Sequence, residues 1–264
     1  MIDSLKSALI PRVILLVFGA VSLLPVATGA RTQPTPRTPG PAITSGPRAW
    51  ALATTAFLTY KNRGRIDMLS PDARNHSNVA EMRGLLHDQW GVDNRSGLLR
   101  ALEWIESGRI RLDFQKLGQS LVAMTDARYK ASLFEERNRP YHVRLMKLTR
   151  EHFRKYRGNS VVAWDYGRYI MLCRWGYMLG FLTEDEAWRR IMPAARTIQR
   201  SFRSWDEFGE DYLVGREFWS PVEMDKSGGT YRDIQKWLRN EPQSPWNQLP
   251  WRMELGPGVP SRRR

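Results

Sequence analysis

The sequence predicts an all-α protein: an irregular multi-helix array in a single domain, preceded by an N-terminal leader and a proline-rich linker. Apolar residues recur at helical spacing along most of the chain. Two Ser/Thr-x-x-Glu motifs mark helix starts. The sequence has no alternating apolar–polar series and no Asn-Gly hairpin, and these are the patterns that would indicate strands. The residues that follow position 48 are enough for one domain with a substantial core.

Residues 1–30 have the layout of a secretory signal peptide. Lys6 and Arg12 precede an apolar run at 13–24, Pro25 breaks that run, and small residues extend to Ala30. As a helix the run spans about 18 Å, well short of the ~30 Å hydrocarbon core of a bilayer. Cleavage near Ala30 is therefore favoured. An uncleaved anchor, with membrane contact through residues 13–30, and a misassigned start codon are the alternatives.

Residues 31–48 (RTQPTPRTPGPAITSGPR) contain five prolines and few apolar side chains, which is typical of a disordered linker. Residues 49–251 are the predicted helical domain, and residues 252–264 a basic flexible tail. With either a cleaved leader or an anchor, the domain is expected outside the cytoplasm, either periplasmic or secreted, or tethered to the inner membrane.

The first half of the domain should contain five helices separated by glycine and proline. Gly64 and Gly108 follow helix ends, and Asp93 is the expected cap of the third helix. Pro140 separates the last two helices, which are longer and more polar, and the segment at 158–160 offers the next helix cap. The predicted helices are residues 50–60, 79–90, 94–106, 116–137 and 141–157.

Residues 161–180 (VVAWDYGRYIMLCRWGYMLG) are apolar on nearly every side, which predicts a helix at the centre of the domain. Asp165 and Arg168 lie three residues apart on one face of this helix and can pair. Cys173 falls inside the apolar stretch, so a buried structural thiol is expected.

Two capping motifs open the next helices. Thr183 and Glu186 form a predicted capping box before a helix at 184–202. Ser204 and Glu207 form a second predicted capping box before a helix at 205–217. Pro221 and Gly228-Gly229 indicate loops, with a last helix at 231–239. The segment from Pro242 should be extended and folded back by its tryptophans.

The formal net charge of +14 favours anionic partners. The basic residues recur through the domain, with one compact cluster at residues 262–264, and a dispersed excess is more typical of solubility than of a nucleic-acid site. No nucleic-acid partner is therefore expected, since that role needs a contiguous basic stripe in a cytoplasmic protein. An envelope protein or an anionic envelope polymer is the expected partner.

Neither a cofactor nor a metal is predicted. Cys173 is the single cysteine, and none of the four histidines forms a pair at metal-ligand spacing. The sequence contains no glycine-rich phosphate loop and no Gly-x-Ser-x-Gly motif.

Asp165 and Glu184 are the candidate catalytic carboxylates. Two carboxylates near one site divide into acid and base when their surroundings separate their pKa values, and Arg168 or Arg216 would bind an anionic group of the substrate. This hydrolase hypothesis requires both carboxylates to line one open cleft, roughly 5–9.5 Å apart. The favoured interpretation is structural, since buried ion pairs fix how helices meet without catalysis.

Aromatic residues offer a second set of binding candidates. Several tryptophans could form an aromatic cleft that binds a sugar or a cation. Their helical spacing makes core packing the favoured interpretation. The cleft would use Trp164, Trp175, Trp188, Trp205 and Trp219, of which Trp164, Trp188, Trp205 and Trp219 are the binding candidates.

An ordered set of motifs resembles the bacterial family known as domain of unknown function 1266, from about residue 49 to residue 251. The motifs are WGVDNRSGLL (90–99), AWDYGR (163–168), RWGY (174–177), GFLTEDEAW (180–188), FRSWDEF (202–208), YLVGR (212–216), FW (218–219) and SPWNQLPW (244–251). This chain has Gly108-Arg109-Ile110 where the family often has Gly-His-Arg, so a role for that histidine is absent here. The resemblance implies a mostly helical fold and no known activity.

The leader, the linker, the basic charge and the lack of a catalytic motif together predict a non-enzymatic binding or interaction module of the bacterial cell envelope. The alternative is the envelope hydrolase that uses Asp165 and Glu184.

Overall fold

The computed structural model describes residues 41–71 and 76–256, and every regular element in these residues is a helix, as the sequence predicts. The leader at 1–30, most of the linker and the end of the basic tail lie outside the described residues. In the described part of the chain, no helix is both long and apolar enough to cross a membrane.

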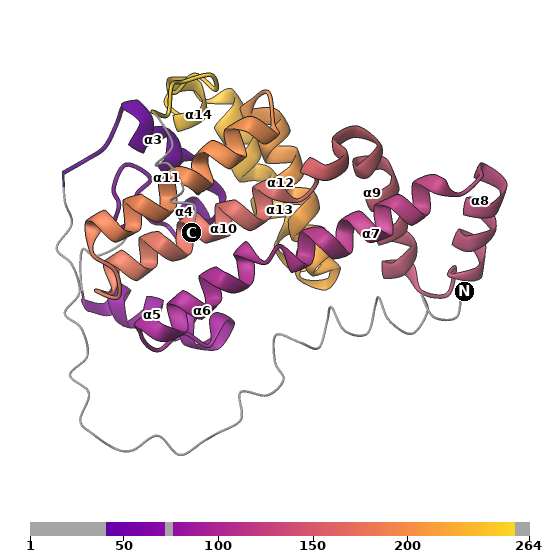
Figure 1. Cartoon of the computed structure of the whole chain (residues 1–264), viewed down its shortest axis with the longest axis horizontal. Coiled ribbons are helices and arrows are strands. Elements are labelled where there is room, and N and C mark those ends of the chain that lie inside the picture. The colour runs from indigo at the N-terminus through magenta and orange to yellow at the C-terminus, as the bar shows by residue number, and fades with distance from the viewer. Residues whose placement is uncertain (1–40, 72–75, 257–264) are drawn as a thin grey trace, which may run out of the picture.

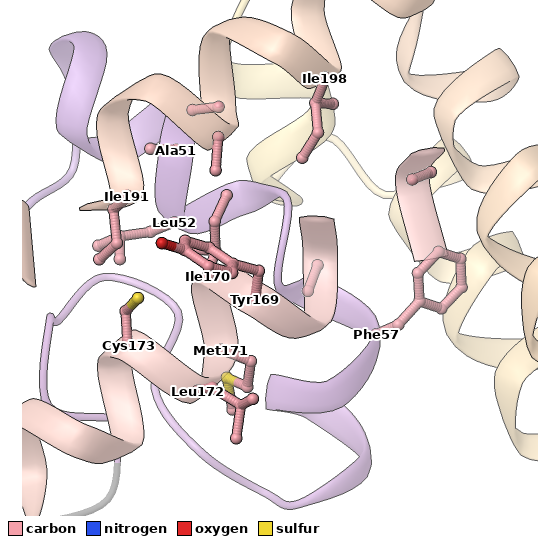
Figure 2. Packing of buried hydrophobic residues seen from close by; sticks show 14 of the residues in the cluster. Ala51, Leu52, Phe57, Tyr169, Ile170, Met171, Leu172, Cys173, Ile191 and Ile198 are labelled. Carbon is pink, nitrogen blue, oxygen red and sulfur yellow. The ribbon is translucent and has the colours of Figure 1, made fainter. Parts of the chain in front are cut away.

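Helix α10 (Val162–Met178) is the central element of the body, as its apolar composition predicts (Figure 1). Only Tyr166 and Tyr177 of its residues are not buried. It packs against α11 (Glu184–Ser201), α12 (Trp205–Trp219), α6 (Arg95–Glu106) and α4 (Ala56–Lys61). Figure 2 shows its apolar side chains among those of α3 and α11. Cys173 is fully buried there, and burial raises the pKa of its thiol, which keeps it protonated.

Helices α7 (Arg109–Ala123), α8 (Asp126–Glu135) and α9 (Pro140–Tyr156) extend to one side of the body (Figure 1). We call residues 109–156 the arm. Helices α7 and α9 pack side by side. Their close approach requires Gly118, because a Cβ atom there would lie 2.4 Å from the Phe153 ring.

The C-terminal segment folds back onto the body through its tryptophans, as predicted. Trp246, in the short helix α14 (Pro245–Gln248), stacks on Trp205 with ring centroids 5.6 Å apart. Trp251 meets Trp205 edge-on at 4.8 Å and Trp50 of α3 (Gly46–Ala53) at 5.1 Å. The indole N–H groups of Trp205, Trp246 and Trp251 all donate to main-chain carbonyls, whereas that of Trp50 has no hydrogen-bond partner among the described residues.

Two predicted helices are each divided in the structure. Residues 50–60 form α3 and α4, because Thr54 and Thr55 donate their hydroxyls to the carbonyls of Ala51 and Leu52 and end α3. Residues 116–137 are divided between α7 and α8, where Thr125 caps α8 by accepting the Arg128 N–H. Neither break is marked by a glycine or a proline, so the sequence pattern continues through both positions.

Two helix caps also differ from those that the sequence predicts. Asn94, not Asp93, caps α6 by accepting the Gly97 N–H, and Asp93 instead contacts Nδ1 of His87 in α5 (His76–Trp90) at 2.6 Å. Ser160 does not cap α10, whose preceding residue Val161 has a left-handed φ of 67°.

The loops predicted at Pro221 and Gly228-Gly229 are not formed. One continuous helix, α13 (Pro221–Asn240), runs through both positions, with Ser220 as its cap and Pro221 at its first turn. Proline is compatible with a first turn because no intrahelical bond uses its nitrogen. Met224, Tyr231 and Leu238 are buried on one side of α13, and this tertiary burial outweighs the poor helix propensity of the two glycines.

Candidate functional site

Asp165 lies in the first turn of α10, where two arginines bind its carboxylate. Arg168 donates to it at 2.7 Å, as the spacing predicts, and Arg111 of the arm donates at 2.8 Å. The Asp165 side chain is 2% exposed. Burial raises the pKa of Asp165, and the two guanidinium groups act in the opposite direction. Asp165 therefore holds the arm to α10.

Glu184 lies at the opposite end of α10, in the first turn of α11. From Asp165 to the end of α10 the helix rises about 20 Å. The Glu184 side chain is 56% exposed, accepts the indole N–H of Trp188 at 3.2 Å and lies 3.6 Å from Arg48. The structure does not bring Asp165 and Glu184 together. This pair does not form the shared open cleft that the hydrolase hypothesis requires.

Four of the sequence-predicted binding residues do meet. The guanidinium of Arg168 lies 4.3 Å from the ring centroid of Trp164, and that of Arg216 lies 5.8 Å from the same ring and 5.3 Å from Trp219. The two indole rings are 5.9 Å apart. We call Trp164, Arg168, Arg216 and Trp219 the arginine–tryptophan cluster. It joins the first half of α10 to the second half of α12.

The other two candidate tryptophans lie elsewhere. Trp188 packs under the guanidinium of Arg48 at 4.8 Å, near the start of α11. Trp205 belongs to the aromatic cluster that holds the C-terminal segment. The alternative of one shared aromatic cleft is therefore not formed by these candidates, and Trp205 has the core role that its helical spacing favours.

Within the arginine–tryptophan cluster, the two arginines differ in their partners. Arg168 donates to Asp165 and to the carbonyl of Trp164. Arg216 is 5% exposed, its Nη2 donates to the Ser227 hydroxyl over a long 3.4 Å, and its side chain also hydrogen-bonds to that of Tyr231. Its Nη1 has no hydrogen-bond partner among the described residues, and the same is true of Trp164 Nε1 and the Tyr212 hydroxyl.

Arg174, in the second half of α10, is a buried arginine whose two terminal nitrogens both have oxygen acceptors, while its Nε has no partner among the described residues. Its Nη1 donates to the hydroxyls of Thr55 and Thr59 at 2.5 and 2.7 Å, and its Nη2 donates to the carbonyls of Arg65 and Met68. Burial lowers the pKa of Arg174 to about 9. Four oxygens tie Arg174 to the segment around α4, so its role is architectural.

Sequence reasoning missed a buried polar pair at the start of α10. Asp211 of α12 is fully buried and accepts the main-chain N–H groups of Val161 and Ala163 at 2.6 and 2.8 Å. It also contacts Nε2 of His152 at 2.6 Å. A negative charge at a helix N-terminus is favourable. No local pattern indicates this cap, because its residues are about 50 positions apart.

Sequence reasoning also missed the concentration of charge on the arm. The arm contains twelve Lys/Arg and five Asp/Glu residues, a net charge of +7 and half of the +14 of the whole chain. Counting charge by segment would have found this excess. An open groove of about 750 Å³ lies on the arm, and its lining residues are Leu133, Phe134, Arg137, Pro140, Val143, Arg144, Lys147, Leu148, Glu151 and Glu217.

Comparison with known proteins gives one match. No curated protein and no solved structure matches this chain. The model of a family described as "Protein of unknown function (DUF1266)" matches residues 85–251. That range includes the arm, the arginine–tryptophan cluster and every motif that carries the resemblance, although it begins later than residue 49. Because the match extends over more than half of the chain, this protein belongs to the DUF1266 family of proteins of unknown function.

Proposed function

We propose that this protein is a non-enzymatic binding module of the bacterial cell envelope, and that its arm holds an acidic, amphipathic segment of a partner protein. The observation that carries the proposal is the groove on the arm, where apolar and basic side chains lie together. An amphipathic helix docks in such a groove through apolar anchors, and its charges meet complementary charges at the rim.

The apolar part of the groove comes from α8 and α9. Phe134 is 65% exposed, which is unusual for a large apolar side chain. Leu133, Val143 and Leu148 line the same groove and are only partly buried. The guanidinium of Arg137 lies 4.1 Å from the Phe134 ring centroid and fixes the ring at the surface. These side chains provide anchor sites for apolar groups of a partner.

The basic part of the groove continues along α9. Lys147 and Glu151 line both this groove and a second one of about 650 Å³, which also contacts Tyr129, Arg150, Arg154 and Lys155. Arg144 is bound to Glu217 and Asp225, so its charge is largely used within the protein. Lys147 is exposed and forms no ion pair within the described residues. It is the cation best placed to meet an acidic partner.

The mixed lining favours a protein segment over a plain polyanion. An anionic envelope polymer or a nucleic acid would bind through charge alone, with a steep dependence on salt. Either would have no use for Phe134 and Leu133. A partner with carboxylates on one face and leucine-like side chains on the other uses both parts of the groove.

A binding titration tests this proposal. The full chain is titrated with three labelled probes: a helical peptide of leucine and glutamate at amphipathic spacing, poly-glutamate, and a duplex DNA. We expect the amphipathic peptide to bind most tightly, and Phe134→Ser and Lys147→Glu each to weaken it about tenfold or more. Val222→Ser and Lys236→Glu, both at exposed positions of α13, are the matched controls and should bind like wild type. Tighter binding of poly-glutamate or DNA, with no effect of Phe134→Ser, would contradict the proposal.

The envelope location rests on residues 1–30 and needs its own test. A basic start, a short apolar run and small residues before Ala30 support export. Alkaline phosphatase fused after residue 48 should be active in bacterial cells, since that enzyme needs an oxidising compartment to form its disulfides. An inactive but stable fusion would place the arm and its partner in the cytoplasm.

A further inference from the structure

Arg216 is a buried arginine without a carboxylate partner among the described residues, and its guanidinium lies 5.8, 5.3 and 5.6 Å from the ring centroids of Trp164, Trp219 and Tyr231. Arg168 has Asp165, Arg150 has Asp126 at 2.8 Å, and Arg174 has four oxygens. Arg216 has no carboxylate within 4.0 Å in the described part of the chain, and its Nη1 has no partner there. A buried charge without a partner is strongly unfavourable, so its presence needs an explanation.

The carboxylates around Arg216 are engaged elsewhere. Asp165 binds Arg168 and Arg111, and Asp211 binds two main-chain amides and His152. Glu223, which is near enough to interact electrostatically with Arg216, forms its ion pair with Lys226 at 3.0 Å. None of these side chains can turn to Arg216 without leaving another buried or paired group unsatisfied.

The groups around Arg216 are mostly donors. Trp164 Nε1 and the Tyr212 hydroxyl are buried and have no hydrogen-bond partner among the described residues. Both belong to rings that pack together, with centroids 5.2 Å apart. The Ser227 hydroxyl accepts from Arg216 and donates to the Glu223 carbonyl, and the Tyr231 hydroxyl also accepts from Arg216, so the unused donors are those of Trp164 and Tyr212. Unused donors around an unpaired cation are the complement of an anion with several acceptor oxygens.

Two of the residues that contact Arg216 reach the surface of the protein. Trp219 and Ser227, on either side of it, are only partly buried. Ser227 stands beside Gly228-Gly229 in α13, and a Cβ atom on Gly229 would meet no atom within 4 Å. Glycines weaken a helix interior. Residues 227–229 of α13 are therefore the part of the helix that can move away from Arg216 at the lowest cost in free energy.

We propose that Arg216 is an anion-binding residue, and that together with the unused donors of Trp164 and Tyr212 it holds an oxyanion, the carboxylate or phosphate group of a ligand, beneath α13. The planar guanidinium presents two N–H groups to two oxygens of one anion, which an ammonium group does not do. The indole and hydroxyl donors then satisfy the remaining oxygen atoms. This site is separate from the groove of the arm.

Thermal unfolding of the full chain at constant ionic strength tests the site. The probes are inorganic phosphate and acetate, with chloride as the reference anion. We expect phosphate, acetate or both to raise the Tm of wild type by several degrees above chloride, with saturation. A response to phosphate alone identifies a phosphate site, and a response to acetate alone identifies a carboxylate site. Equal Tm values in all three salts would overturn the proposal.

Two substitutions of Arg216 distinguish a binding site from architecture. Arg216→Met should abolish the anion-dependent increase in Tm, and in chloride its Tm should equal or exceed that of wild type, because it removes an unpaired buried charge. Arg216→Lys keeps the charge and should reduce the increase. Arg100→Met, at an exposed position of α6, is the matched control and should retain it.

Arg174→Met is the architectural reference, because it should lower the Tm in chloride. A loss of Tm in Arg216→Met as large as in Arg174→Met, or an undiminished anion response in Arg216→Met, would show that Arg216 is structural.

Discussion

Asp211 and His152 form a buried pair that joins the arm to the body. Nε2 of His152, in α9, lies 2.6 Å from the Asp211 carboxylate, and neither side chain is more than 3% exposed. The same carboxylate accepts two main-chain N–H groups at the start of α10. One side chain therefore fixes α9, α10 and α12 relative to one another.

Removing the Asp211 carboxylate should be costly. Asp211→Ala leaves two buried amides and His152 without their acceptor, and we expect a loss of about 3 kcal/mol in the free energy of unfolding. Asp211→Asn retains one acceptor oxygen and should lose about half as much. Urea unfolding measures both. Asp206→Ala, at a position 58% exposed in the same helix, should change stability by less than about 1 kcal/mol, and an equal effect of the two alanine variants would disprove the capping role.

Glu186 predicts a dependence of stability on pH. Its hydrogen bond with Arg95, followed by that with the Thr183 main chain, lowers the pKa of Glu186 to about 2. The ordinary pKa of a glutamate is about 4.3. Because the folded-state pKa is the lower one, the stabilisation is complete above about pH 4.3 and is lost as the pH falls toward 2.

Glu186→Gln should accordingly destabilise the protein by about 1 kcal/mol at pH 7, since the pair with Arg95 is partly exposed. The difference from wild type should shrink between pH 4 and pH 2 in urea titrations. A difference that stays constant across that range would show that the ionised carboxylate does not contribute.

The local signals in the sequence predict the local structure well. The apolar run at 161–180 gives α10, and Thr183 and Ser204 both cap helices as expected. The Ser204 cap differs from a capping box in one respect. The Glu207 carboxylate accepts the main-chain N–H of Arg203, whereas in a capping box it would accept that of Ser204. These features depend on residues within four positions of each other.

What the sequence could not predict depends on distant residues. The cap of α10 comes from Asp211, and Arg111 reaches Asp165 from another helix. The sequence grouped Arg168, Arg216 and Glu184 as candidate site residues, and the structure brings the two arginines to the Trp164 ring but leaves out Glu184. That residue opens α11 at the far end of α10, and only the connection between the two helices determines this position.

Two glycines inside helices, Gly229 of α13 and Gly118 of α7, provide a further prediction. A Cβ atom on Gly229 meets nothing within 4 Å, and Gly229 lies inside a regular helix. Gly229→Ala should therefore stabilise the protein by about 0.5–1 kcal/mol. Gly118→Ala should do the opposite, with a loss of about 1–3 kcal/mol, because its methyl group would overlap the Phe153 ring. If Gly229→Ala lowers the urea midpoint, α13 is not the continuous helix described.

A charge exchange tests the proposed function most directly. The affinity of wild type and Lys147→Glu is measured for the leucine–glutamate peptide and for a matched leucine–lysine peptide. Wild type should prefer the acidic peptide, and Lys147→Glu should lose about tenfold for it while gaining affinity for the basic one. Lys236→Glu should behave like wild type. If Lys147→Glu and wild type bind both peptides equally, the arm is not the binding surface and the central claim is wrong.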